Sequence, residues 1–481
     1  MAVGKGCLQL PPKLPHPFGA KRFPAQIGQK IADFTPYCGS CPATGAQRAF
    51  ARQAPGHQPF FLYAPLLSTP CFMSKPYFVN PAHSRPEPAD YPIVAKTPAM
   101  EKRYRPDRTV PIGLFVEDYI NGRVDIKGGD KEFRAFIHHR KKYLNHKFVW
   151  RNYRWAFGFL LIDTIRHSKA QDIRIGKAHY DRGNDFFRAF LGDRMVYTSG
   201  FFHSLDETVD QAQDNKMDMV CRKLQLKEGE QFLDIGCGWG SLAIYAAKNY
   251  GVYSTGVTIS KEGVDYGRAR AQELGVADRV EFVEKDYRDT PRKGYDKIAS
   301  LEMAEHVGLK NFLKFQKLVY SLLREDNPNG IYYLQLAGLK QGVFQESMVW
   351  GLFMNEYIFP GADASTPLNW YIKNLEKARF ELRTVENLGI HYSHTLEAWY
   401  QNWESNKEAM LSKYGEWWYR LWRIFLPWSA EIAAQGNAAA YGMLSAKNRL
   451  DTDRNRFIGG YTMGERNLDK EVTPLPEFAM A

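Results

Sequence analysis

A short glycine-rich loop between a strand and a helix constrains this chain more than any other feature. It reads Asp234-Ile-Gly-Cys-Gly-Trp-Gly240 and follows the apolar strand expected at 231–234. Glycines let backbone N–H groups approach a ligand closely and direct the N-terminus of the next helix at it. A nicotinamide dinucleotide site needs Gly-x-Gly-x-x-Gly, whereas Gly236, Gly238 and Gly240 follow a different spacing after an acid. This pattern favours a cationic, amino-acid-bearing ligand over a pyrophosphate.

Strands and helices alternate from about residue 228 onward. The alternation predicts an α/β fold, a doubly wound, seven-stranded and mostly parallel sheet with its site at the carboxyl ends of the strands. The aromatic-rich segment 343–430 is expected to form helical insertions that cap the site. The expected strands are 231–234, 253–259, 280–286, 297–301, 331–336, 380–386 and 441–446, and the helices between them are 243–249, 262–274 and 311–323.

The positive charge of the chain lies mostly in its first segment. Residues 1–86 hold nine Lys and Arg against one acid and so carry +8 of the total +11. We predict a disordered tail there, typical of a transit peptide for organelle import or of a poorly defined start. The predicted regions that follow are a basic helical region at 87–170, the main domain at 171–450 and a C-terminal tail at 451–481. Because the charge belongs to a tail, it does not indicate nucleic acid.

Cysteine usage gives no metal site. Cys38-Gly-Ser-Cys41 is a single CxxC without a second pair at zinc-site spacing, so we predict no metal. No stretch reaches the ~18 uncharged apolar residues of a spanning helix.

The segment 131–168 reads as a basic helix with interleaved aromatic residues. It could lie on an anionic membrane surface or pack its aromatic stripe on the main domain, and the sequence leaves both open. We therefore expect any membrane contact to be peripheral.

Acidic residues follow two more of the expected strands. Glu302-Met-Ala-Glu-His-Val-Gly308 comes after the fourth strand, and its two acids and histidine are candidates for acid–base chemistry. Asp286 closes the third strand, where it could accept a hydrogen bond from an adenine amine or cap a turn.

These motifs together resemble the superfamily of cyclopropane-fatty-acid synthases and mycolic-acid-modifying methyltransferases. In closer detail they resemble the fungal sphingolipid 9-methyltransferases. The resemblance implies a class I S-adenosylmethionine-dependent methyltransferase fold. The matching segments are 178–187, 197–200, 233–240, 256–260, 286–289, 301–308, 334–338, 350–355 and 357–367.

The resemblance implies the contacts to S-adenosylmethionine residue by residue. The glycines and Asp286 are also supported by their own positions. The expected contacts are Tyr197, Thr198, Asp234, Gly236, Cys237, Gly238, Trp239, Gly240, Ser241, Thr258, Gly263, Asp286, Tyr287 and Arg288.

For catalysis, the resemblance implies Glu305 as the base or base-holder, together with Tyr392. His306 could orient Glu305 or could simply pack. Cyclopropane synthases hold a bicarbonate with a Cys, a Glu, a His and a Tyr. Glu305 and Tyr392 match, but Ser199 and Gln335 replace the Cys and the His. A bicarbonate is therefore doubtful, and a product other than a ring is favoured.

The implied reaction transfers a methyl group to a carbon–carbon double bond of a lipid chain through a carbocation. Carbon 9 of the sphingoid base of glucosylceramide is the expected acceptor. Aromatic faces in 343–430 could stabilise the cation, or could form a core. The alternatives are a cyclopropane-fatty-acyl-phospholipid synthase, a small-amine N-methyltransferase and a non-catalytic membrane-binding module. We expect a peripheral protein at the cytoplasmic face of the endoplasmic reticulum, of open oligomeric state.

Overall fold

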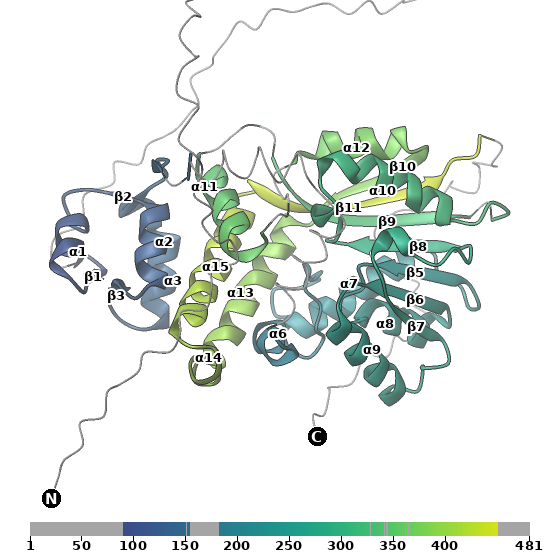
Figure 1. The fold of residues 1–481 in the computed structure, drawn as a ribbon, viewed down its shortest axis with the longest axis horizontal. Helices are drawn as coiled ribbons and strands as arrows, with labels where there is room; N and C mark the ends of the chain where they lie inside the picture. The colour runs from purple at the N-terminus through teal and green to yellow at the C-terminus, as the bar shows by residue number, and fades with distance from the viewer. Residues whose placement is uncertain are drawn as a thin grey trace, which may run out of the picture. The chain divides into compact units, whose positions relative to one another are not determined.

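The computed structural model describes residues 90–150, 152–153, 182–327, 329–340, 342, 345–360, 362 and 366–450 (Figure 1). The predicted tails, 1–86 and 451–481, lie outside these residues. So do residues 151 and 154–168 of the basic segment.

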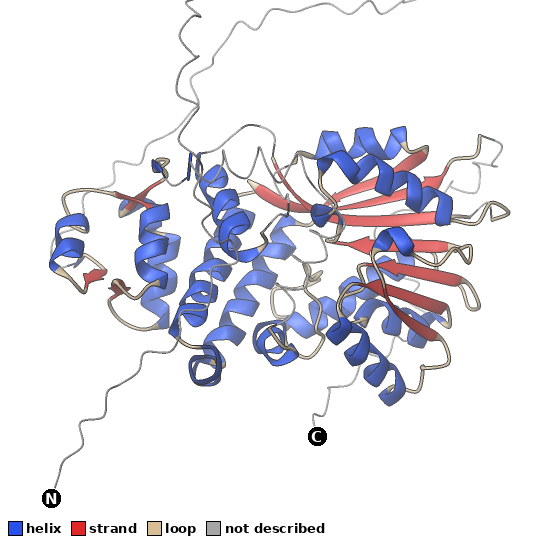
Figure 2. Cartoon of the chain, in the orientation of Figure 1, coloured by secondary structure: helices blue, strands red, loops and turns tan. Residues whose placement is uncertain are grey.

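A seven-stranded sheet forms the centre of the described chain (Figure 2). The strand order is β10-β11-β9-β8-β5-β6-β7, and β11 runs antiparallel to both of its neighbours while the other pairs are parallel. This confirms the predicted doubly wound, mostly parallel sheet. The strands are β5 (Gln231–Ile235), β6 (Tyr253–Thr258), β7 (Val280–Glu284), β8 (Lys297–Leu301), β9 (Ile331–Leu339), β10 (Phe380–Asn387) and β11 (Ala438–Lys447).

Helices cover both faces of the sheet because its strands are apolar on both sides. In β5, Phe232 packs into a core with α7, α8 and α9, while Leu233 and Ile235 belong to a second core with α10 and α12. Successive side chains of a strand point to opposite faces, which explains this division. The helices are α7 (Val209–Lys223), α8 (Ser241–Tyr250), α9 (Lys261–Glu273), α10 (Leu309–Leu322) and α12 (Leu368–Lys377).

The order of the strands reverses at β5. From β5 the chain continues outward through β6 and β7, and it then returns to the other side of β5 to form β8 and β9. Asp234 near the end of β5 pairs with Gly256 of β6 and with Ala299 of β8. Such a reversal opens a crevice at the carboxyl ends of the strands, where ligands of this fold class bind.

The aromatic-rich segment is mostly helical, as predicted, apart from β10. Its largest side chains form a core, because Trp399, Trp403, Trp422 and Trp428 are fully buried. Of the two roles left open for the aromatic residues, these four rings take that of an aromatic core. The helices of this region are α11 (Gln345–Phe353), a π-helical turn (Met354–Ile358), α13 (Gly389–Ser405), α14 (Lys407–Tyr414) and α15 (Glu416–Ala434), and they share their core with α6 (Asn184–Leu191).

The N-terminal described region packs on α15 through α2 and α3 (Figure 1). It contains two small two-stranded sheets, β1 with β3 and β2 with β4. The elements are β1 (Ile93–Ala95), α1 (Pro98–Arg103), β2 (Val110–Pro111), α2 (Ile112–Ile120), β3 (Val124–Ile126), α3 (Asp130–His138), a 3₁₀ turn (Arg140–Lys142) and β4 (Leu144–Asn145).

The prediction of one basic helix from 131 is wrong, since α3 ends at His138. Phe133, Phe136 and Ile137 are buried in the core shared with α15, so the aromatic stripe packs on the protein. Arg140 is buried as well and pairs with Glu346 of α11. Among the described residues, no helix is long and apolar enough to cross a bilayer.

Candidate active site

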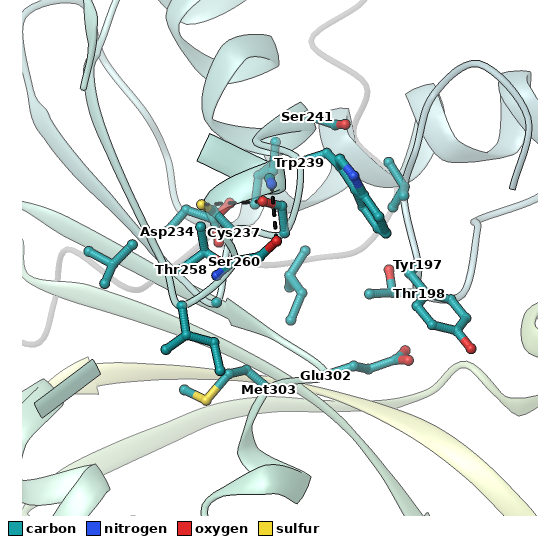
Figure 3. A pocket seen from close by; sticks show the side chains of 18 of the residues that line it. Tyr197, Thr198, Asp234, Cys237, Trp239, Ser241, Thr258, Ser260, Glu302 and Met303 are labelled. Atoms are coloured by element: carbon teal, nitrogen blue, oxygen red, sulfur yellow. Dashed lines mark hydrogen bonds between the residues drawn. The ribbon is translucent and has the colours of Figure 1, made fainter. Parts of the chain in front are cut away.

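A cavity lies at the carboxyl ends of β5, β6, β7 and β8, where the fold places a ligand (Figure 3). It brings together twelve of the fourteen residues predicted to contact the cofactor. They are Tyr197, Thr198, Asp234, Gly236, Cys237, Gly238, Trp239, Ser241, Thr258, Gly263, Asp286 and Tyr287.

The glycine loop adopts a backbone that side chains would obstruct. Gly236 has φ +81°, and a Cβ there would lie 2.5 Å from Cγ of Met303. Gly240 has φ +86° and begins α8, but a Cβ on it would meet the Phe282 ring at 2.3 Å. Gly240 is not among the cavity-lining residues, so its role is to let the helix approach β7 rather than to face the ligand.

Asp286, Tyr287 and Arg288 form a turn after β7. The Asp286 carboxylate accepts a hydrogen bond from the Arg288 backbone N–H at 2.9 Å and pairs with the Arg288 guanidinium at 3.3 Å. Asp286 therefore caps its own turn, one of the two roles considered for it, while also lining the cavity. Arg288 is not among the lining residues, because its guanidinium is held by Asp286 and the Tyr287 hydroxyl.

Asp234 places a buried carboxyl group beside the loop, with 2% of the residue exposed. Burial raises its pKa to about 7, and the nearby Lys216 opposes that shift. A carboxyl group in this state gains charge when a cationic ligand arrives. It is a suitable partner for a ligand that bears an ammonium or sulfonium group.

Lys216 of α7 is a site residue that the sequence analysis missed. It is fully buried, lines the cavity and donates a hydrogen bond to the Thr198 hydroxyl. Burial lowers its pKa to about 8, although Glu302 and Asp234 act in the opposite direction. A lysine on a 15-residue amphipathic helix resembles any solvated lysine, so the sequence offered no signal for it.

Glu302 is the acid of its motif that faces the cavity (Figure 3). Its carboxylate accepts hydrogen bonds from Gln335 Nε2 at 2.7 Å, the Tyr392 hydroxyl at 2.9 Å and the Ser199 backbone N–H at 3.3 Å. Burial raises its pKa, and Lys216 together with the three donors acts against that shift. Four separate segments of the chain thus converge on one carboxylate.

Glu305 occupies a different place from the one expected. Its Oε1 accepts a hydrogen bond from the Ala337 backbone N–H at 2.5 Å, and it is not among the cavity-lining residues. Tyr392, expected to act with Glu305, donates its hydroxyl to Glu302 instead. His306 does line the cavity, with its ring 6.0 Å from that of Phe359. The position of Glu305 therefore argues against its assignment as the base.

A comparison with family models matches residues 167–442 to "mycolic acid cyclopropane synthetase", which covers more than half of the chain. The chain belongs to this family. Its members are methyltransferases that use S-adenosylmethionine, and the Asp234 pocket and the glycine cradle fit such a cofactor. This membership argues against the alternative of a non-catalytic membrane-binding module.

Named relatives give the comparison more detail. Sphingolipid C9-methyltransferase B of Emericella nidulans is 42% identical over 76% of this chain and 71% of its own length. Sphingolipid C9-methyltransferase of Komagataella phaffii is 42% identical over 74% of each chain. Among solved structures, mycolic acid cyclopropane synthase CmaA1 in complex with SAH and CTAB is 25% identical, with a TM-score of 0.54 over 57% of this chain and 98% of that chain.

Proposed function

We propose that this methyltransferase transfers the methyl group of S-adenosylmethionine to carbon 9 of the sphingoid base of glucosylceramide, at an existing double bond. The observation that carries the proposal is the 42% identity, over about three quarters of the chain, to proteins named sphingolipid C9-methyltransferase. The site supports it, because the lining of the cavity includes the apolar side chains of Met195, Met217 and Leu301 as well as Glu302. A lipid chain suits such a wall better than a small polar amine does.

The part of the cavity lined by the glycine loop is assigned to the cofactor. The loop backbone at Gly236 and Gly238 would hold the amino-acid part, with Asp234 beside its ammonium group, and Asp286 and Tyr287 lie where the adenine is expected. When bound, S-adenosylmethionine supplies an electrophilic methyl group. The chain orients the two reactants, excludes water and provides a proton acceptor.

The buried Asp234 predicts a pH-dependent affinity for the cofactor. Its pKa is about 7, so it becomes neutral below that pH and loses its attraction for a cation. The Kd for S-adenosylmethionine should fall by up to about tenfold per pH unit as the pH rises toward 7, and then level off. Calorimetry between about pH 5.5 and 7.5 measures this while Lys216, with a pKa of about 8, stays charged. Asp234→Asn should flatten the profile, and a flat profile in the unaltered protein would refute the assignment.

A peripheral membrane contact is also part of the proposal. Trp150 is 79% exposed and Tyr153 is 48% exposed, and Lys142 and Lys147, which precede them in the sequence, are exposed as well. A segment that exposes both aromatic rings and lysines suits an anionic lipid surface. This segment supports a peripheral protein, which we assign to the cytoplasmic face of the endoplasmic reticulum.

The experiment is expression of the whole chain in a host that makes glucosylceramide with an unsaturated sphingoid base but adds no methyl branch. Mass spectrometry of the lipids should show a 9-methyl sphingoid base. Cyclopropyl acyl chains in phospholipid would instead favour the synthase alternative, and N-methylated amines would favour the amine alternative. Fractionation of the same cells tests the contact, since a chain absent from the endoplasmic reticulum membranes contradicts it.

A further inference from the structure

The hydrogen-bond donors that could hold an anion in the active site already bind a side chain of the protein, the Glu302 carboxylate. Ser199, Gln335 and Tyr392 stand at three of the four positions that the family resemblance assigns to a bicarbonate. The Ser199 backbone N–H, the Gln335 amide and the Tyr392 hydroxyl all donate to the Glu302 carboxylate. A bicarbonate in this place would compete for donors that are in use and would lie against a like charge. The residues present therefore do not fit that anion.

The backbone of Glu302 supports a functional position. Glu302 has φ +53°, a left-handed conformation that is uncommon for residues other than glycine. Its N–H remains bonded to the Gln335 carbonyl at 2.8 Å, so the strand pairing continues while the side chain enters the cavity. Conformations of this kind cost about 1 kcal/mol or more, and they cluster at functional sites.

We propose that Glu302 is the base of the reaction, a protein carboxylate that replaces a bound bicarbonate. This inference rests on the proposed methylation of a carbon–carbon double bond. Glu302 faces the cavity on the side of Tyr197 and Thr198, across from the cofactor loop (Figure 3).

The step balances with the groups at hand. The π electrons of the alkene form the bond to the methyl carbon as the carbon–sulfur bond breaks, and sulfur keeps that pair. The neighbouring carbon becomes cationic. Glu302 takes a proton from a carbon adjacent to the cation, and the C–H electrons form the new double bond. The products are S-adenosylhomocysteine, a methyl-branched alkene and one proton, which passes from Glu302 to solvent when the lipid leaves.

The surroundings of Glu302 suit this task. Burial raises the pKa of the carboxyl group, which makes it a stronger proton acceptor than an exposed glutamate. Lys216 and the three donors keep the ionised form accessible in the resting site. The Tyr392 pKa is raised well above its usual range by burial and by Glu302, so the hydroxyl stays protonated and continues to donate.

The test measures S-adenosylhomocysteine formed by the purified full-length chain with an extract of total lipid as acceptor. Glu302→Gln should lower turnover by about 10²-fold or more, the range of a lost general base. Its Kd for S-adenosylmethionine should stay within about threefold of the unaltered protein. Glu408→Gln, an exposed glutamate on α14, is the matched control and should leave turnover unchanged.

A second measurement varies the anion in the buffer. The unaltered protein should turn over equally fast in carbon-dioxide-free buffer and in millimolar bicarbonate, whereas Glu302→Gly should regain turnover as formate or bicarbonate is added. Dependence of the unaltered protein on bicarbonate would overturn the proposal, as would Glu302→Gln with turnover within tenfold of normal. Loss of turnover in Glu305→Gln with retention in Glu302→Gln would assign the base to Glu305 instead.

The outcome is separable from the choice of substrate. Methylation of a phospholipid acyl chain would refute the sphingolipid assignment. It would not affect the test of Glu302, because S-adenosylhomocysteine is formed with every acceptor and its rate can still be compared between Glu302→Gln and the unaltered protein. Methyl transfer to nitrogen alone would overturn both, since no carbocation would then require a base.

Discussion

Gly263→Ala is expected to weaken S-adenosylmethionine binding by about 10²-fold. Gly263 lies in the first turn of α9, and a Cβ there would stand 2.5 Å from the carbonyl oxygen of Gly238. That oxygen belongs to the backbone of the cofactor loop and has no flexible side chain that could move aside. The loop must shift. A misplacement of about 1 Å in an active site can cost 10²-fold in rate, and we expect a loss of similar size in cofactor affinity. Overpacking should also lower the free energy of unfolding by about 1–3 kcal/mol.

The control for this substitution is Gly351→Ala. Gly351 lies in α11, and a Cβ there meets nothing within 4 Å. Alanine in a helix should stabilise the protein by about 0.5–1 kcal/mol and leave the Kd unchanged. Calorimetric titration, with thermal melting to verify folding, measures both variants. A Gly263→Ala protein that binds the cofactor with normal affinity would contradict the arrangement of the loop.

The sheet and its cofactor loop could be predicted because their signals are local. Gln231–Ile235, the glycines after it and the helix from Ser241 are consecutive, and the chemistry of glycine and of apolar strands determines their geometry. The position of the acidic motif Glu302–Gly308 could be predicted for the same reason, because it directly follows the apolar strand β8 and so lies at the edge of the site.

The roles within that motif could not be predicted in the same way. Glu302 and Glu305 are three residues apart, but Glu302, whose backbone is left-handed, lines the cavity and Glu305 does not. The partners of Glu302 come from positions 199, 335 and 392, which the fold brings together over long stretches of sequence. The family resemblance pointed to these three positions, but as surroundings of a bicarbonate beside Glu305 and not as donors to Glu302.

In the basic segment, the sequence pattern indicated an exposed charge at a residue that is buried, Arg140. Arginine is mostly exposed in proteins, so Arg140 within a run of lysines indicated a surface. Its partner Glu346 is 206 residues away, and no local pattern relates the two. The charge of Arg140 serves instead to join the N-terminal region to α11.

Arg140→Ala should therefore destabilise the protein by about 3 kcal/mol, because it leaves a buried carboxylate with weaker partners. The Arg140 Nε lies 2.6 Å from Glu346, and both side chains are buried. The remaining partners of Glu346 are His146 at 3.4 Å and Lys141 at 3.1 Å, the latter 52% exposed. Urea unfolding at neutral pH measures the change as a lower midpoint. Lys141→Ala is the control and should cost less than about 1 kcal/mol, as exposed ion pairs do.

The pH dependence distinguishes a lost ion pair from lost packing. Burial opposes ionisation of Glu346, but His146, Arg140 and Lys141 together hold its pKa well below the usual range. A carboxyl group with a lowered pKa contributes its stabilisation above the unfolded-state value of about 4.3 and loses it as the pH falls further. The difference between Arg140→Ala and the unaltered protein should therefore shrink in acid. A difference that stays constant from neutral pH down to about pH 3 would show that the arginine contributes through its packing alone.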